Sequence, residues 1–182
     1  RVGRLSLESF AFVRAASDLV RFRRTGLSSA TPYNVAASRI LGLEAALAGE
    51  LLDALSITAT ATVLDPRETT RDRARDPTTN DVLPLMSKLV GSLRLEAFAA
   101  PGWRALAQDR VSAAVAFFHR STRYDDPAGL TVLPAQSLFD AELASSHFDA
   151  ALQVRFAMRN VFDARQLDLL GLPVPGRSAH LE

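Results

Sequence analysis

Apolar and polar residues alternate along much of this 182-residue chain, in segments separated by turn-forming residues. The alternation is clearest in Leu55–Val63, where Leu, Ile, Ala and Val take every second position and Ser and Thr the positions between. Successive side chains of a β-strand point to opposite faces of its sheet, so this stretch predicts a strand with one apolar and one polar face. Residues 152–159, 88–97 and 4–14 alternate similarly, although Phe10 and Phe12 fall on the polar parity of the last segment.

Weaker segments bring the expected number of strands to about nine. They are 19–24, 34–47, 110–121, 136–146 and 176–182. The expected lengths of roughly 8 to 13 residues exceed the usual 5 to 6 of globular sheets and suit tilted strands that cross a membrane. Residues 42–55, "GLEAALAGELLDAL", are rich in Ala, Leu and Glu, so a helix is an open alternative there.

The connections between these segments are expected to alternate in length. Short links fall at 16–18, 49–53, 101–106 and 146–149, and long polar ones at 25–34, 65–84, 121–134 and 163–176. In an antiparallel meander this puts every short turn at one end of the sheet and every long loop at the other. Outer-membrane barrels have this arrangement, with short periplasmic turns and long extracellular loops.

The pattern therefore predicts an all-β fold, an antiparallel up-and-down segment of a transmembrane β-barrel. Alternation alone does not say which face meets a core, so a soluble β-sandwich or a lipocalin-like barrel stays open as the alternative. No run approaches the roughly 18 apolar residues of a transmembrane helix, which excludes a helical span but not a membrane barrel.

Charge and cysteine content exclude several classes of protein. The 21 basic and 20 acidic residues give a formal net charge of +1, which provides no basic field for nucleic acid. The absence of cysteine excludes disulfides and thiolate metal sites.

No motif indicates an enzyme. His119, His147 and His180 are too scattered in sequence for a metal-binding spacing such as HExxH. There is no GxSxG nucleophile motif, and "TGLSSATP" lacks the pattern of a phosphate-binding loop. We expect no catalytic residue, metal site or cofactor.

Two loops carry charged residues that are candidates for contacts. The first, "RETTRDRARD", is either a self-compensated solvated loop or a contact surface for an anionic ligand or lipopolysaccharide phosphate. Its charged residues are Arg67, Arg71, Arg73 and Arg75, with Glu68, Asp72 and Asp76. The second contains Arg123, Tyr124, Asp125 and Asp126, which either face a ligand or build the turn before Pro127.

The stretch "NVFDARQLDLLGLPVPGRS" resembles the C-terminal hairpin of TonB-dependent outer-membrane receptors. Asn160–Asp163 matches the family's Asn-hydrophobic-Phe-Asp strand exit, and Pro173–Arg177 matches the Pro-x-Pro-Gly-Arg entry into the last strand. Residues 34–47 are similar to another strand of the family, through Asn34, Val35, Ala37, Gly42 and Glu44. We expect Asp163 to accept hydrogen bonds from its own loop backbone and Gly176 to allow a tight entry into the final strand.

The resemblance implies that residues 1–182 form part of a larger barrel of about 22 strands with a plugged lumen, without the plug domain or the N-terminal strands. It also implies TonB-dependent uptake of a scarce nutrient, such as a ferric siderophore or a cobalamin-like compound, across the outer membrane of a Gram-negative bacterium. The expected partners are outer-membrane lipid, a ligand such as a metal chelate, and a TonB-type energy-coupling protein that acts through the plug.

Under this resemblance, the polar parity of the strands faces the lumen. Its residues either meet the plug or a passing ligand, or only solvate the wall: Arg94, Glu96, Gln153, Arg155 and Arg159. A passive outer-membrane porin is the alternative within membrane proteins. A soluble β-sandwich that binds ligands or partners is the alternative from a different class.

Overall fold

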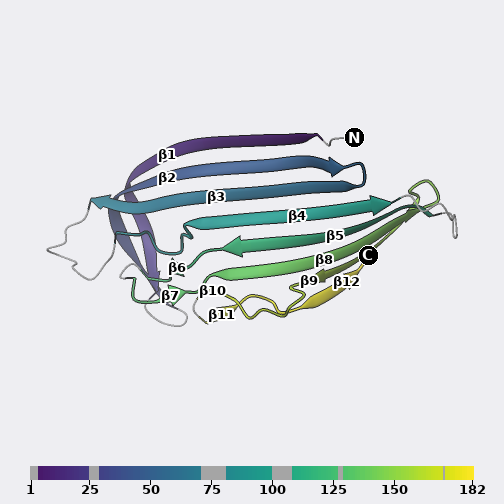
Figure 1. Cartoon of the computed structure of the whole chain (residues 1–182). Coiled ribbons are helices and arrows are strands. Elements are labelled where there is room, and N and C mark those ends of the chain that lie inside the picture. Colours follow the sequence, from purple (N-terminus) through teal and green to yellow (C-terminus); the bar gives the residue numbers. More distant parts are fainter. Residues whose placement is uncertain (1–3, 25–28, 71–80, 100–107, 127–128, 170) are drawn as a thin grey trace.

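The computed structural model describes residues 4–24, 29–70, 81–99, 108–126, 129–169 and 171–182, and its main element is one antiparallel sheet (Figure 1). The strands of this sheet are β1 (Leu5–Arg24), β2 (Ala30–Leu52), β3 (Leu55–Thr70), β4 (Leu89–Ala99), β5 (Gln108–Arg120), β8 (Gln136–His147), β9 (Leu152–Arg159) and β12 (Ser178–Leu181). Two small hairpins lie in the connections: β6 (Arg123–Tyr124) with β7 (Val132–Leu133), and β10 (Leu167–Leu169) with β11 (Leu172–Pro173). Within the described residues, no helix is long and apolar enough to span a membrane.

Each strand of the main sheet pairs with the next strand of that sheet along the chain, in the order β1-β2-β3-β4-β5-β8-β9-β12. This is the up-and-down topology that the alternating links predict. The β2–β3 turn and the β8–β9 turn lie at one end of the sheet, here called the turn end (Figure 1). The hairpins β6–β7 and β10–β11 lie at the opposite end, here called the loop end.

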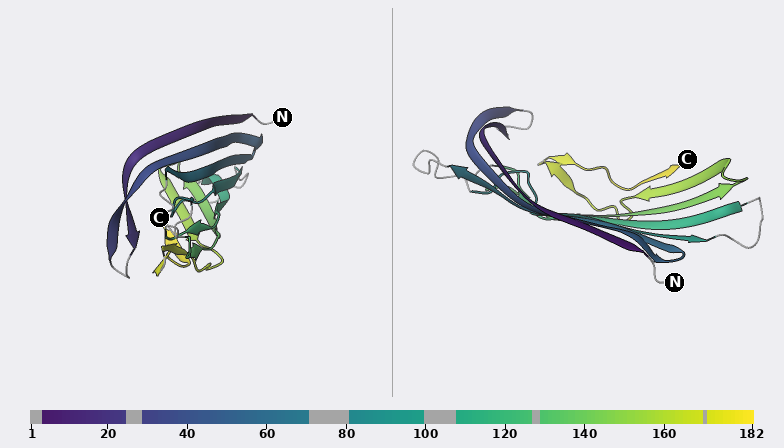
Figure 2. Two further views of the ribbon diagram at one scale, coloured as in Figure 1. Left: turned by 90° about the vertical axis from the view of Figure 1, so that its left-hand side faces the viewer. Right: turned by 90° about the horizontal axis from the view of Figure 1, so that it is seen from above.

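The prediction of a short turn at residues 16–18 is wrong, because β1 continues through them, and the main sheet of the described residues has eight strands rather than about nine. The pairing with β2 keeps its register from Ser17 to Leu19, and the distortion is confined to Asp18, whose φ is 52°. Asp tolerates this left-handed backbone better than most residues. Beyond this region the β1–β2 hairpin bends out of the sheet (Figure 2).

Of the two readings left open for residues 42–55, the strand is confirmed and the helix is excluded, because β2 runs to Leu52 and β3 starts at Leu55. Two of the expected links need correction. The links expected at 25–34 and 49–53 are both shorter, since β2 starts at Ala30 and continues to Leu52. The link expected at 101–106 lies outside the described residues.

The pairing register puts the polar parities of neighbouring strands on one face and the apolar parities on the other. On the polar face, the hydroxyl oxygens of Thr60 and Ser92 lie 2.7 Å apart. The polar face carries Ser56, Thr58, Thr60 and Thr62 of β3, Ser92, Arg94 and Glu96 of β4, Asp140 and Glu142 of β8, and Arg155 and Arg159 of β9. The apolar face carries Leu55, Ile57 and Val63, Leu93 and Leu95, Val115 and Phe117, Phe139 and Leu143, and Val154, Phe156 and Met158.

Nothing in the described structure packs over the apolar face as a second layer. Leu7 and Val13 are each 69% exposed, and Leu143 is 56% exposed. From Leu5 to Val13 the apolar positions of β1 extend over a stretch whose length is close to the roughly 9 to 11 residues of a tilted strand that crosses a bilayer. The sheet therefore has the dimensions of a wall that meets lipid on one side.

Candidate functional site at the loop end

The loop between β9 and β12 folds back over the loop ends of β5 and β8 and is held there by three long polar side chains. Arg120 donates from Nη1 and Nη2 to Asp168 Oδ1 at 3.0 and 3.1 Å. Arg123 Nη2 donates to the carbonyls of Leu167 at 3.1 Å and Asp168 at 2.6 Å. Gln136 Nε2 donates to the Leu167 carbonyl at 2.5 Å. Four donor nitrogen atoms of these three side chains thus converge on Leu167 and Asp168 of β10.

Arg123 is buried, which is unusual for an arginine. Its Nη1 atom has no hydrogen-bond partner in the described part of the chain. Burial lowers the pKa of the Arg123 guanidinium, and nearby Arg120 lowers it further, whereas Asp168 and Asp125 raise it. An arginine stays protonated at neutral pH even so. The guanidinium groups of Arg120 and Arg123 therefore share the carboxylate of Asp168, at 3.0 and 3.9 Å.

A cavity of about 470 Å³ adjoins this cluster. It is lined by Phe118 and Leu138 of the polar parity and by residues 172–175, and Arg120, Gln166 and Asp168 supply its polar groups. Ligand sites typically have this size and combine apolar walls with a few convergent polar groups. The cavity suits a ligand with an apolar body and an oxygen-rich or anionic group.

The residues of the "NVFD" motif shape the start of the loop between β9 and β12, whose later residues line this cavity. Asn160 and Asp163 have φ values of 49° and 52°, which Asn and Asp tolerate better than other residues. The Asn160 side chain accepts from the Ala164 amide at 2.8 Å and donates to the Ala164 carbonyl at 3.0 Å. Asp163 Oδ1 accepts from the Arg177 amide at 2.9 Å, as expected. A Cβ at Gly176 would lie 2.9 Å from the same oxygen, which explains the glycine there.

The polar residues predicted to face the lumen meet in a charged ladder farther along the polar face. Glu142 is its centre: its carboxylate lies 2.6 Å from Arg155 and 3.3 Å from Arg94, which also lies 3.4 Å from Glu96. Arg159 pairs with Asp140 at 2.9 Å. Gln153 stands opposite Ser146 on the same face. The prediction of a common face is confirmed for these residues, whereas their contact with a plug or ligand stays a prediction.

Of the two charged loops predicted to make contacts, the structure describes only part of the first and all four named residues of the second. Arg67 pairs with Asp65 at 2.7 Å, and Glu68 also takes part in interactions. Arg71, Asp72, Arg73, Arg75 and Asp76 lie outside the described residues. In the second loop, the carboxylate of Asp126 accepts from the amides of Leu130 and Thr131, so this aspartate builds the turn.

Tyr124 and Asp125 are half-buried beside Arg123, and the backbone amide of Asp125 donates a hydrogen bond to the Thr131 carbonyl.

The three histidines each lie near a serine hydroxyl, at 2.9 Å for His119 and Ser137, 3.0 Å for His147 and Ser145, and 3.1 Å for His180 and Ser178. Among the described residues no group of His, Asp and Glu is arranged to hold a metal ion.

Sequence reasoning missed the residues that organise both clusters: Arg120, Gln136, Asp168, Asp140 and Glu142. A signal existed for the two acidic residues of β8, because they share the polar parity of a predicted strand. No local signal exists for Asp168, since its partners lie 48 and 45 residues away in sequence.

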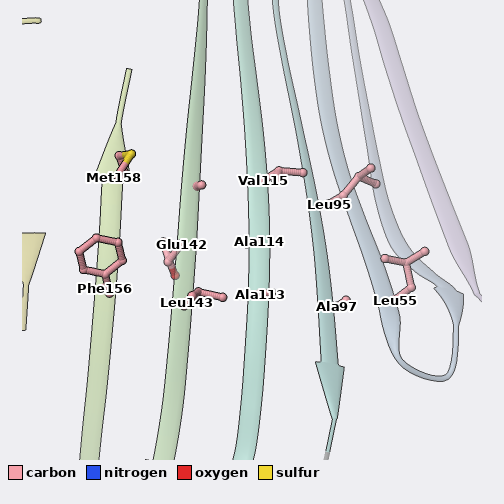
Figure 3. Close-up of a pocket in the computed structure, with 11 residues that line it drawn as sticks. Leu55, Leu95, Ala97, Ala113, Ala114, Val115, Glu142, Leu143, Phe156 and Met158 are labelled. Atoms are coloured by element: carbon pink, nitrogen blue, oxygen red, sulfur yellow. The ribbon is translucent and has the colours of Figure 1, made fainter. Parts of the chain in front are cut away.

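A shallow apolar groove lies on the other face, nearer the turn end (Figure 3). Leu55, Leu95, Val115, Leu143 and Phe156 surround the small side chains of Ala97 and Ala113 there. The groove offers almost no polar group, so its chemistry suits hydrocarbon chains and not a polar solute.

Comparison with known proteins identifies the class of this sheet. Residues 2–161 match the family model described as "TonB dependent receptor-like, beta-barrel". The chain therefore belongs to the TonB-dependent receptor β-barrel family. A comparison with curated proteins finds no match.

Solved structures of siderophore receptors share the fold. The siderophore receptor PiuA from Acinetobacter baumannii superposes with a TM-score of 0.70 at 20% identity, over 97% of this chain and 25% of that one. BauA, the ferric preacinetobactin receptor of the same organism, gives 0.69 at 15% identity, over 99% and 26%. The ferric-catecholate import receptor Fiu from E. coli K12 gives 0.67 at 18% identity, over 98% and 24%. The chain spans about a quarter of the length of each.

Proposed function

We propose that this chain forms part of the wall and of the extracellular loops of an outer-membrane receptor that takes up a scarce nutrient with energy from a TonB-type protein. The single observation that carries the proposal is the two-faced sheet of a TonB-dependent receptor barrel. The proposed ligand is a metal chelate such as a ferric siderophore, and a cobalamin-like compound is the second ligand class.

The apolar face is proposed to meet lipid and the polar face the lumen. Placing the ladder around Glu142 against lipid instead would be costly, since an arginine at the middle of a bilayer costs about 2 to 4 kcal/mol. The exposed leucine and valine side chains would face water in the same arrangement. The energies of both faces therefore favour the same orientation.

The loop end is proposed to face outward and to meet the ligand first. Its cavity lies on the lumen side of the sheet and contains Arg120 and Asp168 beside apolar walls. The structural neighbours are described as receptors for siderophores or ferric-siderophore complexes, and siderophores present oxygen atoms that an arginine can bind.

The remaining parts of the transport machinery are proposed to come from outside residues 1–182. The edges of β1 and β12 lack a partner strand in the described sheet, and further strands would complete a barrel of about 22. A plug inside the barrel would face the ladder and would connect the receptor to TonB. No catalytic chemistry forms part of this proposal.

Uptake by whole cells tests the proposal. Cells that lack their own receptors and express the full-length protein are given a panel of iron-55-labelled ferric siderophores and labelled cobalamin. We expect one ligand class to accumulate, and accumulation to stop when the tonB gene is deleted or the proton gradient is collapsed. Accumulation that persists without TonB would show a passive channel. Recovery of the protein in the soluble fraction would show a soluble binding domain.

A further inference from the structure

Two arginines face each other directly on the apolar side of the sheet, just beyond its apolar band. Arg39 of β2 is the register partner of Arg67 of β3. Both belong to the parity of Leu41 and Val63, so their side chains leave the sheet on the face proposed to meet lipid. Arg39 lies two residues beyond Leu41, about 7 Å along the strand towards the loop end.

This pair of like charges is only partly compensated. Arg67 Nε donates to Asp65 Oδ1 at 2.7 Å, whereas Arg39 is exposed and has no ion-pair partner within the described part of the chain. Like charges directly opposite each other destabilise a strand pair. An anion between the two guanidinium groups would remove this repulsion.

An apolar groove begins directly below the arginine pair. It crosses β1, β2 and β3 and is lined on this face by Ala11, Val13, Leu41, Leu43 and Val63, with Asp65 at its edge. Ala11, Leu43 and Val63 form one row across the three strands. Val13, Leu41 and Asp65 form the next row, and Ala15, Arg39 and Arg67 the row above it.

We propose that this surface binds one lipid of the outer leaflet that carries phosphate on its headgroup, such as lipopolysaccharide. An acyl chain lies in the groove along Leu43 and Val63, and the phosphate lies between Arg39 and Arg67. Guanidinium groups bind phosphate through two parallel hydrogen bonds, so the pair supplies a fork from each side. The small side chain of Ala15 beside Arg39 leaves room for the headgroup.

The position of the site distinguishes a bound lipid from a soluble anion. A free phosphate gains only the two arginines and loses its hydration, whereas a lipid also buries its chain against the groove. The arginines stand at the level where the headgroups of a bilayer begin if the apolar band spans its hydrocarbon core. The inference rests on the proposed outer-membrane placement of the chain.

Lipid binding to the full-length protein in detergent tests the site, measured by native mass spectrometry. The probes are bisphosphorylated lipid A, dephosphorylated lipid A and inorganic phosphate. The variant is Arg39→Gln with Arg67→Gln, and the control is Arg14→Gln, which removes a charge on the opposite face, where Arg14 pairs with Ile40. Folding of each protein is checked by its heat-dependent mobility in SDS gels.

We expect the double variant to bind bisphosphorylated lipid A at least about tenfold more weakly and the control to bind as the parent does. Dephosphorylated lipid A should bind the parent and the double variant equally weakly. The double variant Arg39→Lys with Arg67→Lys keeps both charges and should lose less affinity for bisphosphorylated lipid A than the glutamine variant. If the glutamine variant does not fold, the lysine variant is compared with the parent instead.

Equal binding of bisphosphorylated lipid A by the parent and the double variant would overturn the proposal. Binding of inorganic phosphate as tight as that of the lipid would also overturn it in favour of a soluble-anion site. Failure of the proposed uptake function can be distinguished from failure of this inference. A passive outer-membrane channel would show no TonB-dependent uptake but would still bind the lipid.

Discussion

Phe12 of β1 stands opposite Gly42 of β2, and its ring fills the space on the polar face that a side chain at residue 42 would occupy. A Cβ at this position would overlap the ring. Phe10 lies beside the same ring, with the two centroids 6.2 Å apart. This packing accounts for Phe12 on an otherwise polar parity, because its ring occupies the space beside the bare backbone of Gly42.

Gly42→Ala is therefore expected to destabilise the barrel by about 1 to 3 kcal/mol, since the Phe12 ring must leave its position. The measurement is urea unfolding of the full-length protein in vesicles. Phe12→Ala removes the ring and creates space, so the double variant Phe12→Ala with Gly42→Ala should lose little beyond Phe12→Ala alone. Additive losses in the double variant would show that ring and glycine act independently.

The charged ladder gives a second prediction. The Glu142 side chain is 12% exposed and separates Arg94 from Arg155, so Glu142→Gln leaves two cations without their shared carboxylate. We expect a loss of about 1 to 3 kcal/mol in the free energy of unfolding. Glu8→Gln, an exposed position on the same face, should change it by less than about 0.5 kcal/mol. Equal effects of the two substitutions would show that the ladder contributes no specific stability.

The attachment of the β9–β12 loop gives a third prediction. Asp168→Asn removes the carboxylate between Arg120 and Arg123, while the carbonyl contacts of Arg123 stay in place. The Val174 amide, which donates to the Gln166 carbonyl, should exchange with solvent deuterium roughly two- to fivefold faster. Arg165→Gln changes an exposed charge in the same loop and should leave the exchange rate unchanged. Unchanged exchange in Asp168→Asn would mean that the carbonyl contacts alone hold the loop.

The orientation in the membrane gives a fourth prediction. The chain has no cysteine, so single cysteines provide clean labels within it. Leu172→Cys lies at the loop end and Ala151→Cys at the turn end, and both positions are exposed. A membrane-impermeant maleimide added to intact cells should label residue 172 and spare residue 151, with both labelled after lysis. The reverse pattern would place the turn end outside.

The strands of this sheet were predictable because parity is a local property of the sequence. Leu55–Val63 and Leu152–Arg159 alternate cleanly, and the structure has strands at both places. The turn predicted at residues 16–18 failed for a nonlocal reason: Asp18 distorts the backbone, yet the pairing with β2 continues on both sides of it. Helix propensity in residues 42–55 failed similarly, since pairing with two neighbouring strands outweighs it.

The candidate site was much less predictable than the strands. Arg123 was recognisable as a charged loop residue, but its burial depends on the return of the β9–β12 loop to the end of β5. The arginines predicted to face the lumen do share one face of the sheet, and parity alone assigned them to it. Their partner Glu142 required the register between β4, β5 and β8, which no single segment encodes.

The opposite environments of the two faces are the central claim, and Ala59 and Thr60 test it most directly. These neighbours on β3 point to the apolar and the polar face, respectively. A fluorescent label is attached to Ala59→Cys or to Thr60→Cys in the full-length barrel, reconstituted into vesicles. Quenching by brominated lipid chains and by aqueous iodide is then measured for each label. The account predicts strong quenching by lipid and weak quenching by iodide at residue 59, and the reverse at residue 60. Quenching of residue 59 by iodide but not by lipid would contradict the account, because that face would then meet water or protein instead of the membrane.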